Sequence, residues 1–203
     1  KHTVHLDKVK PERFLLPISK KKTHVIEIHA GQITTTDLTI SLPPTLNFEP
    51  FGGYSKIAAV ERHHNTGKIG VAVAKGYGIR NGAVASSVSH DSHNIIVIGD
   101  NDADMAIAVN EIIRTQGGYT VVENGKVYET LALPIMGLMS DAGFENVNEA
   151  LQRMIQKAHQ MGVASQIDPF VTLSFLALPV IPELRITPRG ICKMTSKGPV
   201  ILS

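Results

Sequence analysis

The chain has 203 residues, a formal net charge of +2, a hydrophobic fraction of 43% and a single cysteine. Its length and composition are ordinary for a folded protein with a sizeable core. The weak net charge excludes a strong general attraction to nucleic acid or anionic lipid. The lone Cys192 excludes an internal disulfide framework and favours a reducing cytoplasm. The lack of a run of about 18 apolar residues argues against a membrane-spanning helix.

Residues 1–22 form a locally basic segment. We interpret it as a solvated connection to an upstream part of the protein, because the chain begins at Lys1 rather than methionine and shows no secretory signal pattern. The alternative is a nucleic-acid-binding arm, but no aromatic residues are interleaved for base stacking. The apolar residues expected to pin the segment to the domain surface are Phe14, Leu15, Leu16 and Ile18. The domain itself is then expected to span residues 23–203.

The next part of the chain reads as strands. Thr23–Leu42 is rich in β-branched residues and is divided by Gly31, which indicates two strands and a turn. Prolines and glycines between positions 43 and 53 indicate a loop. Ile57–Val60 and Ile69–Val73 are predicted to be short strands, joined by the polar segment Glu61–Lys68.

Two helices and a hairpin are predicted further on. Asn101 or Asp102 can cap a helix that Gly117 ends. Asn124-Gly125 is typical of a tight hairpin turn. A second helix is expected from Asn146, with Glu149 completing a capping box, to Gly162.

The apolar run Phe170–Leu178 is followed by Pro179 and Pro182, so we predict a strand that ends at a sheet edge. Strand signals outnumber the two helices, and the predicted hairpins are adjacent in sequence. The fold class is therefore predicted as α+β: a layered domain of largely antiparallel β-sheets with at least two packing helices.

The densest group of reactive side chains lies between two apolar runs in Gly82–Gly99. It comprises His90, Asp91, Ser92, His93 and Asn94. Asp, Ser and Asn favour turns, so a bend between two buried strands is expected here. Asp91 could orient a neighbouring imidazole for general acid–base work. The nearby serines lack the G-x-S-x-G pattern of a nucleophile elbow, which argues against a serine hydrolase.

Histidines 90 and 93 would point to opposite faces of a strand, so they could share a metal ion only in a turn. The histidines at positions 63 and 64 form a second loop that could come close, and zinc, manganese or iron would accept such ligands. The candidate metal ligands are therefore His90, His93, His63 and His64. The interpretation that we favour is that they are structural or support ligands from other residues.

Several long strings together resemble the C-terminal domain of bacterial adenine deaminases. They are GAVASSVSHDSHNIIVIGDNDADM (82–105), Gly117-Gly118, LALPIMGLMSD (131–141) and DPFVTLSFLALPVIPELRIT (168–187), with VERHH (60–64) and KGYGIRNGA (75–83) also similar. The resemblance implies membership of a group similar to other amidohydrolases. Such enzymes combine a metal-binding β/α barrel with a small β-domain, and they hydrolyse adenine to hypoxanthine and ammonia with a divalent metal such as manganese, iron or zinc.

The sequence departs from a complete enzyme of this kind. The family's first metal-binding motif requires two histidines separated by one residue, and this chain has no such pair. The chain is also shorter than the roughly 250 residues of a β/α barrel. The barrel and its metal are therefore expected upstream, and this chain alone is expected to be inactive.

We predict that the residues His90, Asp91, His93 and Asn94 form a turn that supports catalysis at the upstream centre. The alternatives are a non-catalytic structural or oligomerisation module and a stand-alone metal-binding domain. The expected partners are the upstream barrel, a purine substrate and further copies of the protein, but no nucleic acid or membrane.

Overall fold

An eight-stranded β-sheet forms the centre of the computed structural model, which describes residues 1–19 and 22–202. The strand order is β2-β1-β4-β3-β6-β5-β7-β8, and every neighbouring pair is antiparallel except β1 and β4. The strands are β1 (Thr23–Ile28), β2 (Thr35–Ile40), β3 (Tyr54–Val60), β4 (Ile69–Lys75), β5 (Gly82–Ser86), β6 (Ile95–Gly99), β7 (Gly118–Glu123) and β8 (Lys126–Ala132).

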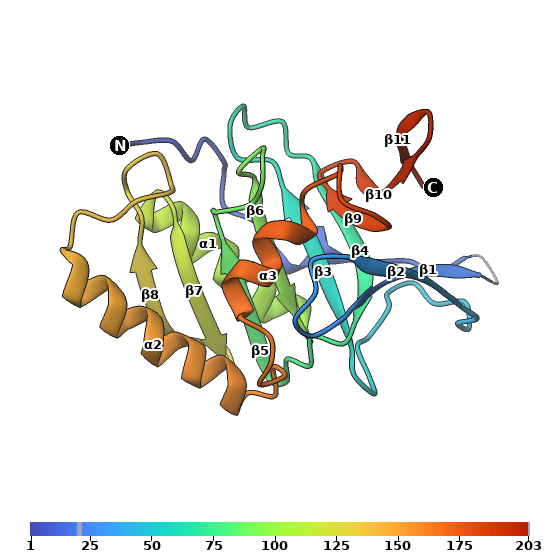
Figure 1. The fold of residues 1–203 in the computed structure, drawn as a ribbon, viewed down its shortest axis with the longest axis horizontal. Helices are drawn as coiled ribbons and strands as arrows, with labels where there is room; N and C mark the ends of the chain where they lie inside the picture. Colours follow the sequence, from blue (N-terminus) through green and yellow to red (C-terminus); the bar gives the residue numbers. More distant parts are fainter. Residues whose placement is uncertain (20–21, 203) are drawn as a thin grey trace.

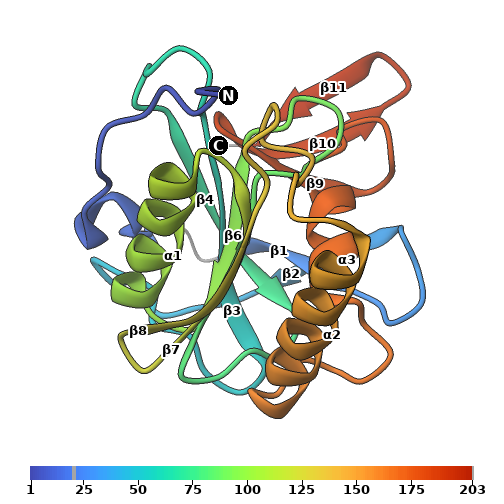
Figure 2. The ribbon, with the colours of Figure 1, turned by 90° about the vertical axis from the view of Figure 1, so that its left-hand side faces the viewer.

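Helices cover both faces of this sheet (Figure 1). They are the 3₁₀ helix η1 (Pro11–Phe14), α1 (Asp102–Thr115), α2 (Phe144–Gln160) and α3 (Pro169–Leu176). A small antiparallel sheet is formed by β9 (Leu184–Thr187), β10 (Gly190–Thr195) and β11 (Gly198–Ile201). Helix α1 packs on one face, whereas α2, α3 and the small sheet lie on the other (Figure 2). The predicted α+β class with largely antiparallel sheets is confirmed.

The two sheets touch at a glycine. A Cβ atom built on Gly70 of β4 would lie 2.0 Å from the carbonyl oxygen of Thr187 and 2.5 Å from the amide nitrogen of Gly190. Only a residue without a side chain allows the backbones to approach so closely. The small sheet therefore packs directly against β4.

The first helix and the hairpin form as predicted, because their end signals are local. The side chain of Asn101 accepts a hydrogen bond of 2.8 Å from the amide of Asp104 at the start of α1. The helix ends at Gln116, which adopts the left-handed conformation just before Gly117. Strands β7 and β8 are joined by Asn124-Gly125, as expected for this dipeptide.

The predicted strand at Phe170–Leu178 is wrong, because this segment contains the helix α3. Asp168 caps the helix by accepting hydrogen bonds from the amides of Phe170 and Val171, and Pro169 occupies its first position. A short apolar run without periodicity does not distinguish a buried strand from a buried helix. Pro179 lies beyond the last helical turn, so it does not oppose the helix.

The predicted start of the second helix is also wrong. Helix α2 begins at Phe144, two residues before the expected position, and Gly143 at its N-cap has no side chain to bond to the first turn. Asn146 instead donates a hydrogen bond of 2.8 Å from its amide group to the carbonyl oxygen of Ala142. Asn146 therefore lies within the helix, and no capping box forms there.

The N-terminal segment lies along the domain. Phe14 and Ile18 are buried as expected, together with Val4 and Val9, whereas Leu15 is 49% exposed and does not pin the segment. Lysines 20 and 21 of the basic segment and the predicted domain end at residue 203 lie outside the described residues. The boundary between residues 22 and 23 stays a prediction.

Candidate functional site

The predicted polar turn joins β5 to β6 at the upper edge of the sheet in Figure 1. Its backbone is closed by a hydrogen bond of 2.7 Å from the amide of His93 to the carbonyl oxygen of Ser89. Helix α3 holds it from the side, because the amide of His90 donates to the carbonyl oxygen of Ser174 at 2.9 Å and the His90 ring lies 5.2 Å from that of Phe175. The backbone of the turn is therefore held in place by its own hydrogen bond and by helix α3.

The four predicted site residues differ in what they can offer a ligand. Asp91 is exposed, and the partly buried rings of His90 and His93 lie 5.8 Å apart edge to face. Asn94 is buried, and its side-chain amide donates to Ser92 Oγ at 3.0 Å and accepts from the amide of Arg62 at 3.3 Å. Asn94 therefore stabilises the turn, whereas the side chains of His90, Asp91 and His93 form no hydrogen bond within residues 1–19 and 22–202.

The second histidine loop, between β3 and β4, lies next to the turn. His63 Nε2 lies 2.7 Å from the carbonyl oxygen of Ser92, and the exposed His64 ring lies 6.3 Å from that of His63. The structure thus brings His63 to the turn, although the sequence separates them by about 30 residues.

These histidines do not fit a complete metal site. Within residues 1–19 and 22–202, no three His, Cys, Asp or Glu side chains lie together so that they could hold an ion. His63 Nε2 is already bonded to a backbone oxygen, and His90 and His93 alone supply only two nitrogens. A protein zinc site needs three or four ligands. The candidate histidines therefore fall short of the number of ligands that a metal ion needs.

Arg62, which the sequence analysis did not identify, is the residue that connects the turn to its surroundings. It is only 2% exposed, and its guanidinium donates at 3.0 Å to the carbonyl oxygens of Thr3 and Met136 and also to that of His93. Burial lowers the pKa of Arg62, and no carboxylate pairs with it among the described residues. The VERHH string gave no sign that this arginine would be buried.

The serines near the turn have structural roles. Ser86, Ser87 and Ser89 are fully buried. Their hydroxyls donate to the carbonyl oxygens of Val88 at 3.0 Å, Gly137 at 2.6 Å and Asn94 at 2.5 Å. These bonds fix the loop after β8 and the turn itself, which agrees with the absence of a nucleophile elbow in the sequence.

The electrostatic surroundings favour a neutral His93. Burial lowers the pKa of His93, and the neighbouring His90 and Arg62 lower it further. Its Nδ1 atom is shielded from solvent and has no hydrogen-bond partner among the described residues. The unprotonated ring nitrogen of a neutral imidazole can accept a hydrogen bond or a proton.

A cavity of about 290 Å³ opens beside the turn. Its polar side is formed by Asp91, Ser92 and Asn94, and the segment after α3 together with β9 supplies an apolar wall. That wall comprises Ala177, Leu178, Pro179, Val180, Ile186 and Pro188. An apolar cavity with a few polar groups on one side is typical of a small-molecule site.

Glu61 organises the histidine loop and makes its stability depend on pH. Its carboxylate accepts hydrogen bonds from the amides of His63, His64 and Thr66, at 2.6, 2.9 and 3.1 Å, and from the Thr66 hydroxyl. Burial acts to raise the pKa of Glu61, but these bonds outweigh it and hold that pKa at about 2. The charged form is therefore strongly favoured in the folded protein.

We expect Glu61→Gln to remove about 2 kcal/mol of stability at neutral pH, after allowance for solvent screening. Because the folded-state pKa is depressed, this contribution is complete above the unfolded value of about 4.5 and is lost as the pH falls toward about 2. Urea unfolding across this pH range measures it. Glu149→Gln is the control, since that side chain is 70% exposed. Parallel pH profiles for the wild type and Glu61→Gln would contradict the prediction.

No helix within the described part of the chain has the length and apolar character needed to cross a membrane.

Comparisons with known proteins agree with the resemblance seen in the sequence. Residues 32–198 match the family model described as the adenine deaminase C-terminal domain. The chain is 47% identical over 192 residues to an adenine deaminase of Desulfitobacterium hafniense, and the match covers 94% of this chain and 34% of that protein. It is 42% identical over 186 residues to an adenine deaminase of Bacillus subtilis, covering 90% and 32%. The chain thus spans about a third of the length of these curated relatives.

Proposed function

Because the chain belongs to the adenine deaminase C-terminal domain family, we propose that it is the C-terminal part of an enzyme that hydrolyses adenine to hypoxanthine and ammonia. The match over residues 32–198 carries this proposal. The relatives are named adenine deaminases and extend well beyond the matched region. The remaining two thirds of such a protein would carry the catalytic portion, with a divalent metal such as manganese, iron or zinc that activates the attacking water.

The part of this chain that we assign to catalysis is the turn with His90, Asp91 and His93. We propose that it faces the catalytic portion, where it closes the site, contacts the purine or supports metal ligands. The support is geometric: three polar side chains keep free atoms, and α3 and Arg62 fix the backbone that carries them. Rigidly held side chains lose little freedom when a substrate or ligand engages them.

Asp91 offers the clearest chemistry. Its exposed carboxylate can accept a hydrogen bond from the amino group of an aminopurine or from an imidazole that serves as a metal ligand. The neutral ring of His93, two residues further on, can accept a hydrogen bond or a proton from a group that lies against it. In either role the turn acts together with groups supplied by the catalytic portion.

We expect Asp91→Asn in the full-length protein to lower kcat for adenine by about 10- to 100-fold, the usual range for a residue that orients metal ligands or substrate. The amide keeps the shape of the carboxylate but removes its charge. Initial rates, metal content and the unfolding temperature should be measured together. His29→Ala is the control for folding, because His29 directly follows β1, and its ring bonds to the Thr36 hydroxyl at 2.8 Å, away from the turn.

A purely structural module would give a different result. In that case Asp91→Asn and His90→Ala would change the unfolding temperature or the oligomeric state, while the rate per folded subunit would stay the same. Unchanged turnover with unchanged metal content would therefore refute the catalytic role of the turn.

Homo-oligomerisation and a cytoplasmic location also belong to the proposal. Strand β8 leaves one edge of the large sheet available for pairing, whereas the amides of Thr35 and Asp37 in β2 already bond to Pro182 and Glu183. The lone Cys192 suits a reducing compartment.

A further inference from the structure

The loop between β8 and α2 exposes several large hydrophobic side chains. Met136 is 59% exposed, Met139 is 53% exposed and Phe144, at the first position of α2, is 79% exposed. Single exposed hydrophobic residues are common, but Met136 and Met139 lie on one tight loop, which is closed by a backbone bridge between Ile135 and Met139. We call Met136 and Met139 the methionine loop patch.

The backbone that carries this patch is fixed at several points. Ser87 Oγ donates to the carbonyl oxygen of Gly137 at 2.6 Å, and Arg62 donates to that of Met136 at 3.0 Å. The backbones of Ile135 and Met139 form an isolated bridge. A patch presented by a fixed backbone loses little conformational entropy on binding, which favours docking.

The patch adjoins the polar turn through Arg62. The same guanidinium that holds the carbonyl oxygen of Met136 also holds that of His93. The methionine loop patch and the proposed catalytic turn are therefore two parts of one surface at the upper edge of the sheet. A single protein domain that covers the patch can also cover the turn.

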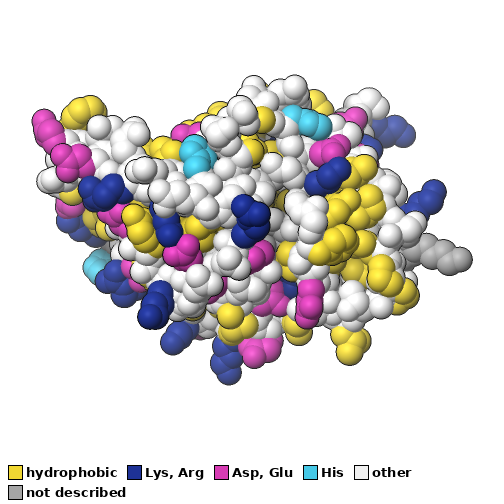
Figure 3. Space-filling model, turned by 90° about the horizontal axis from the view of Figure 1, so that it is seen from below, with side chains coloured by type: hydrophobic (Ala, Val, Ile, Leu, Met, Phe, Trp, Pro, Cys, Tyr) yellow, Lys and Arg dark blue, Asp and Glu magenta, His cyan; other side chains and the backbone are white. Residues whose placement is uncertain are grey.

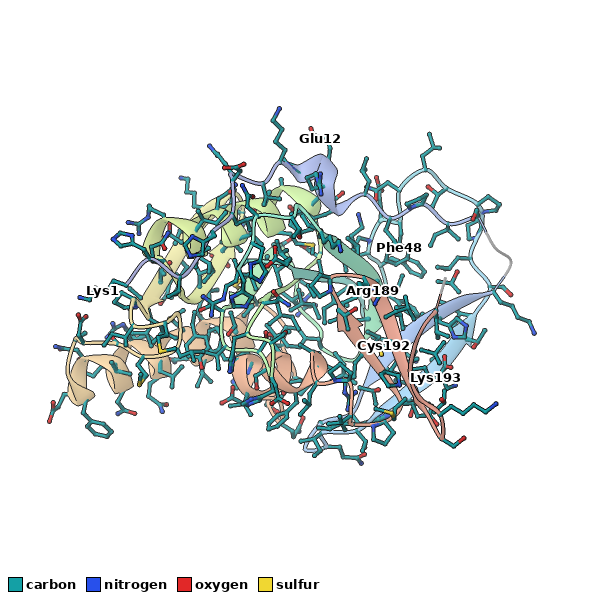
Figure 4. The ribbon with its side chains drawn as sticks, turned by 90° about the horizontal axis from the view of Figure 1, so that it is seen from above. Lys1, Glu12, Phe48, Arg189, Cys192 and Lys193 are labelled. Carbon is teal, nitrogen blue, oxygen red and sulfur yellow. The ribbon has the colours of Figure 1, made fainter. Side chains whose placement is uncertain are left out.

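The N-terminus of the described chain lies at this surface. Lys1 forms an ion pair with Asp141 of the same loop, and the carbonyl oxygen of Thr3 accepts a hydrogen bond from Arg62. From there the segment runs along the α1 side of the molecule to Glu12 in η1 (Figure 4). Any chain that precedes Lys1 therefore emerges beside the methionine loop patch. The relatives are about three times as long as this chain, so the part of such a protein that lies outside the match is a candidate to cover the patch.

We propose that the methionine loop patch is the docking site for the upstream portion of the same polypeptide, which it seats over the turn with His90, Asp91 and His93. The inference deepens the proposed function and rests on it, because it takes the upstream portion to be the catalytic one. The patch supplies apolar contact area, and the neighbouring turn supplies polar groups, as in the core and rim of an interface.

Other exposed hydrophobic residues lie away from this surface. The loop between β2 and β3 carries Leu46 at 91% exposure and Phe51 at 55%. Figure 3 shows the underside of the molecule, where hydrophobic side chains gather on one side and charged side chains are spread over the rest. The N-terminal contacts described above belong to the opposite, upper edge, so they single out the methionine loop patch for the upstream portion.

Methionine oxidation by hydrogen peroxide in the full-length protein tests the docking. The rates at Met136 and Met139, read by mass spectrometry, are expected to be at least about fivefold lower than in the urea-unfolded protein, since a covered thioether is protected from solvent. Met105 and Met154 are 0% exposed and give the rate for a buried side chain. The protection should not change when the protein is diluted.

Two results would overturn the proposal. Oxidation of Met136 and Met139 at the unfolded rate would show that nothing covers the patch. Protection that disappears on dilution, together with dissociation of an oligomer, would show that a second copy covers it instead.

Variants separate docking from the proposed reaction. Met136→Lys with Met139→Lys should expose the polypeptide that immediately precedes Lys1 to chymotrypsin in the full-length protein, whereas Val171→Lys, at a position with 52% exposure on α3, should not. Protected methionines in a wild-type protein that does not deaminate adenine would leave the docking intact and refute the proposed function. Protease resistance equal to the wild type in the double variant would refute the docking alone.

Discussion

Replacing Arg62 with methionine is expected to lower the free energy of unfolding by about 2 to 4 kcal/mol, since each buried acceptor left without its donor costs about 1 to 3 kcal/mol. The carbonyl oxygens of Thr3, His93 and Met136 would all lose a charged donor. Removing a buried charge without a carboxylate partner offsets part of this loss. Urea unfolding with a fixed slope gives the change directly.

The matched control is Arg153→Met. Arg153 pairs with Glu129 at 2.6 Å but is 52% exposed, so its loss should cost less than about 1 kcal/mol. Arg62→Lys keeps the charge but cannot reach three carbonyl oxygens in three directions, so its stability should fall between those of the wild type and Arg62→Met. An Arg62→Met protein as stable as the Arg153→Met protein would show that these bonds contribute nothing net.

The second large effect is expected at Lys56, whose loss should cost about 3 to 5 kcal/mol, as for other buried ion pairs from which one partner is removed. Its ammonium lies 2.5 Å from Asp102 Oδ1, 2.6 Å from Asn47 Oδ1 and 3.0 Å from the carbonyl oxygen of Phe14. Burial lowers the pKa of Lys56, and the carboxylate of Asp102 opposes that shift. Lys56→Met would remove the charged donor from all three oxygens, although Asp102 still accepts from the Asn47 amide group and Asn47 Oδ1 still accepts from the amide of Leu16.

The control for this variant is Lys75→Met. Lys75 pairs with Glu27 at 3.1 Å, but its side chain is 38% exposed, so the effect should stay below about 1 kcal/mol. The double variant Lys56→Met with Asp102→Asn should regain part of the lost stability, because no unpaired charge remains. A single Lys56→Met variant that loses less than Lys75→Met in the same urea titration would contradict the prediction.

Much of the fold could be predicted because its signals are local. Asn101 caps α1, and Asn124-Gly125 joins β7 to β8, where a side chain or a backbone preference decides the conformation within a few residues. The many β-branched strand signals and the hairpins adjacent in sequence likewise predicted the largely antiparallel sheets. Helix α3 was missed because its eight residues are apolar without a helical pattern, so only packing against the sheet distinguishes it from a strand.

The candidate site could be predicted only in part. The sequence indicated a polar turn with His90, Asp91 and His93, and the structure has a turn there. The sequence did not reveal that the side chain of Asn94 is used for hydrogen bonds within the fold, because its partner Arg62 comes from another loop. Nor did it reveal that the methionines at 136 and 139 are exposed, since methionine is more often a core residue.

The sequence by itself determined the α+β class, most of the strand and helix positions, and the family, because these depend on residue order and short-range conformational preference. The tertiary structure decided that Arg62 is buried and that it joins the N-terminal segment, the turn and the loop after β8. The three carbonyl oxygens that it binds lie 59, 31 and 74 residues away along the chain. A hydrogen bond over such separations depends on where the whole sheet places each backbone, and no local pattern in the sequence records that.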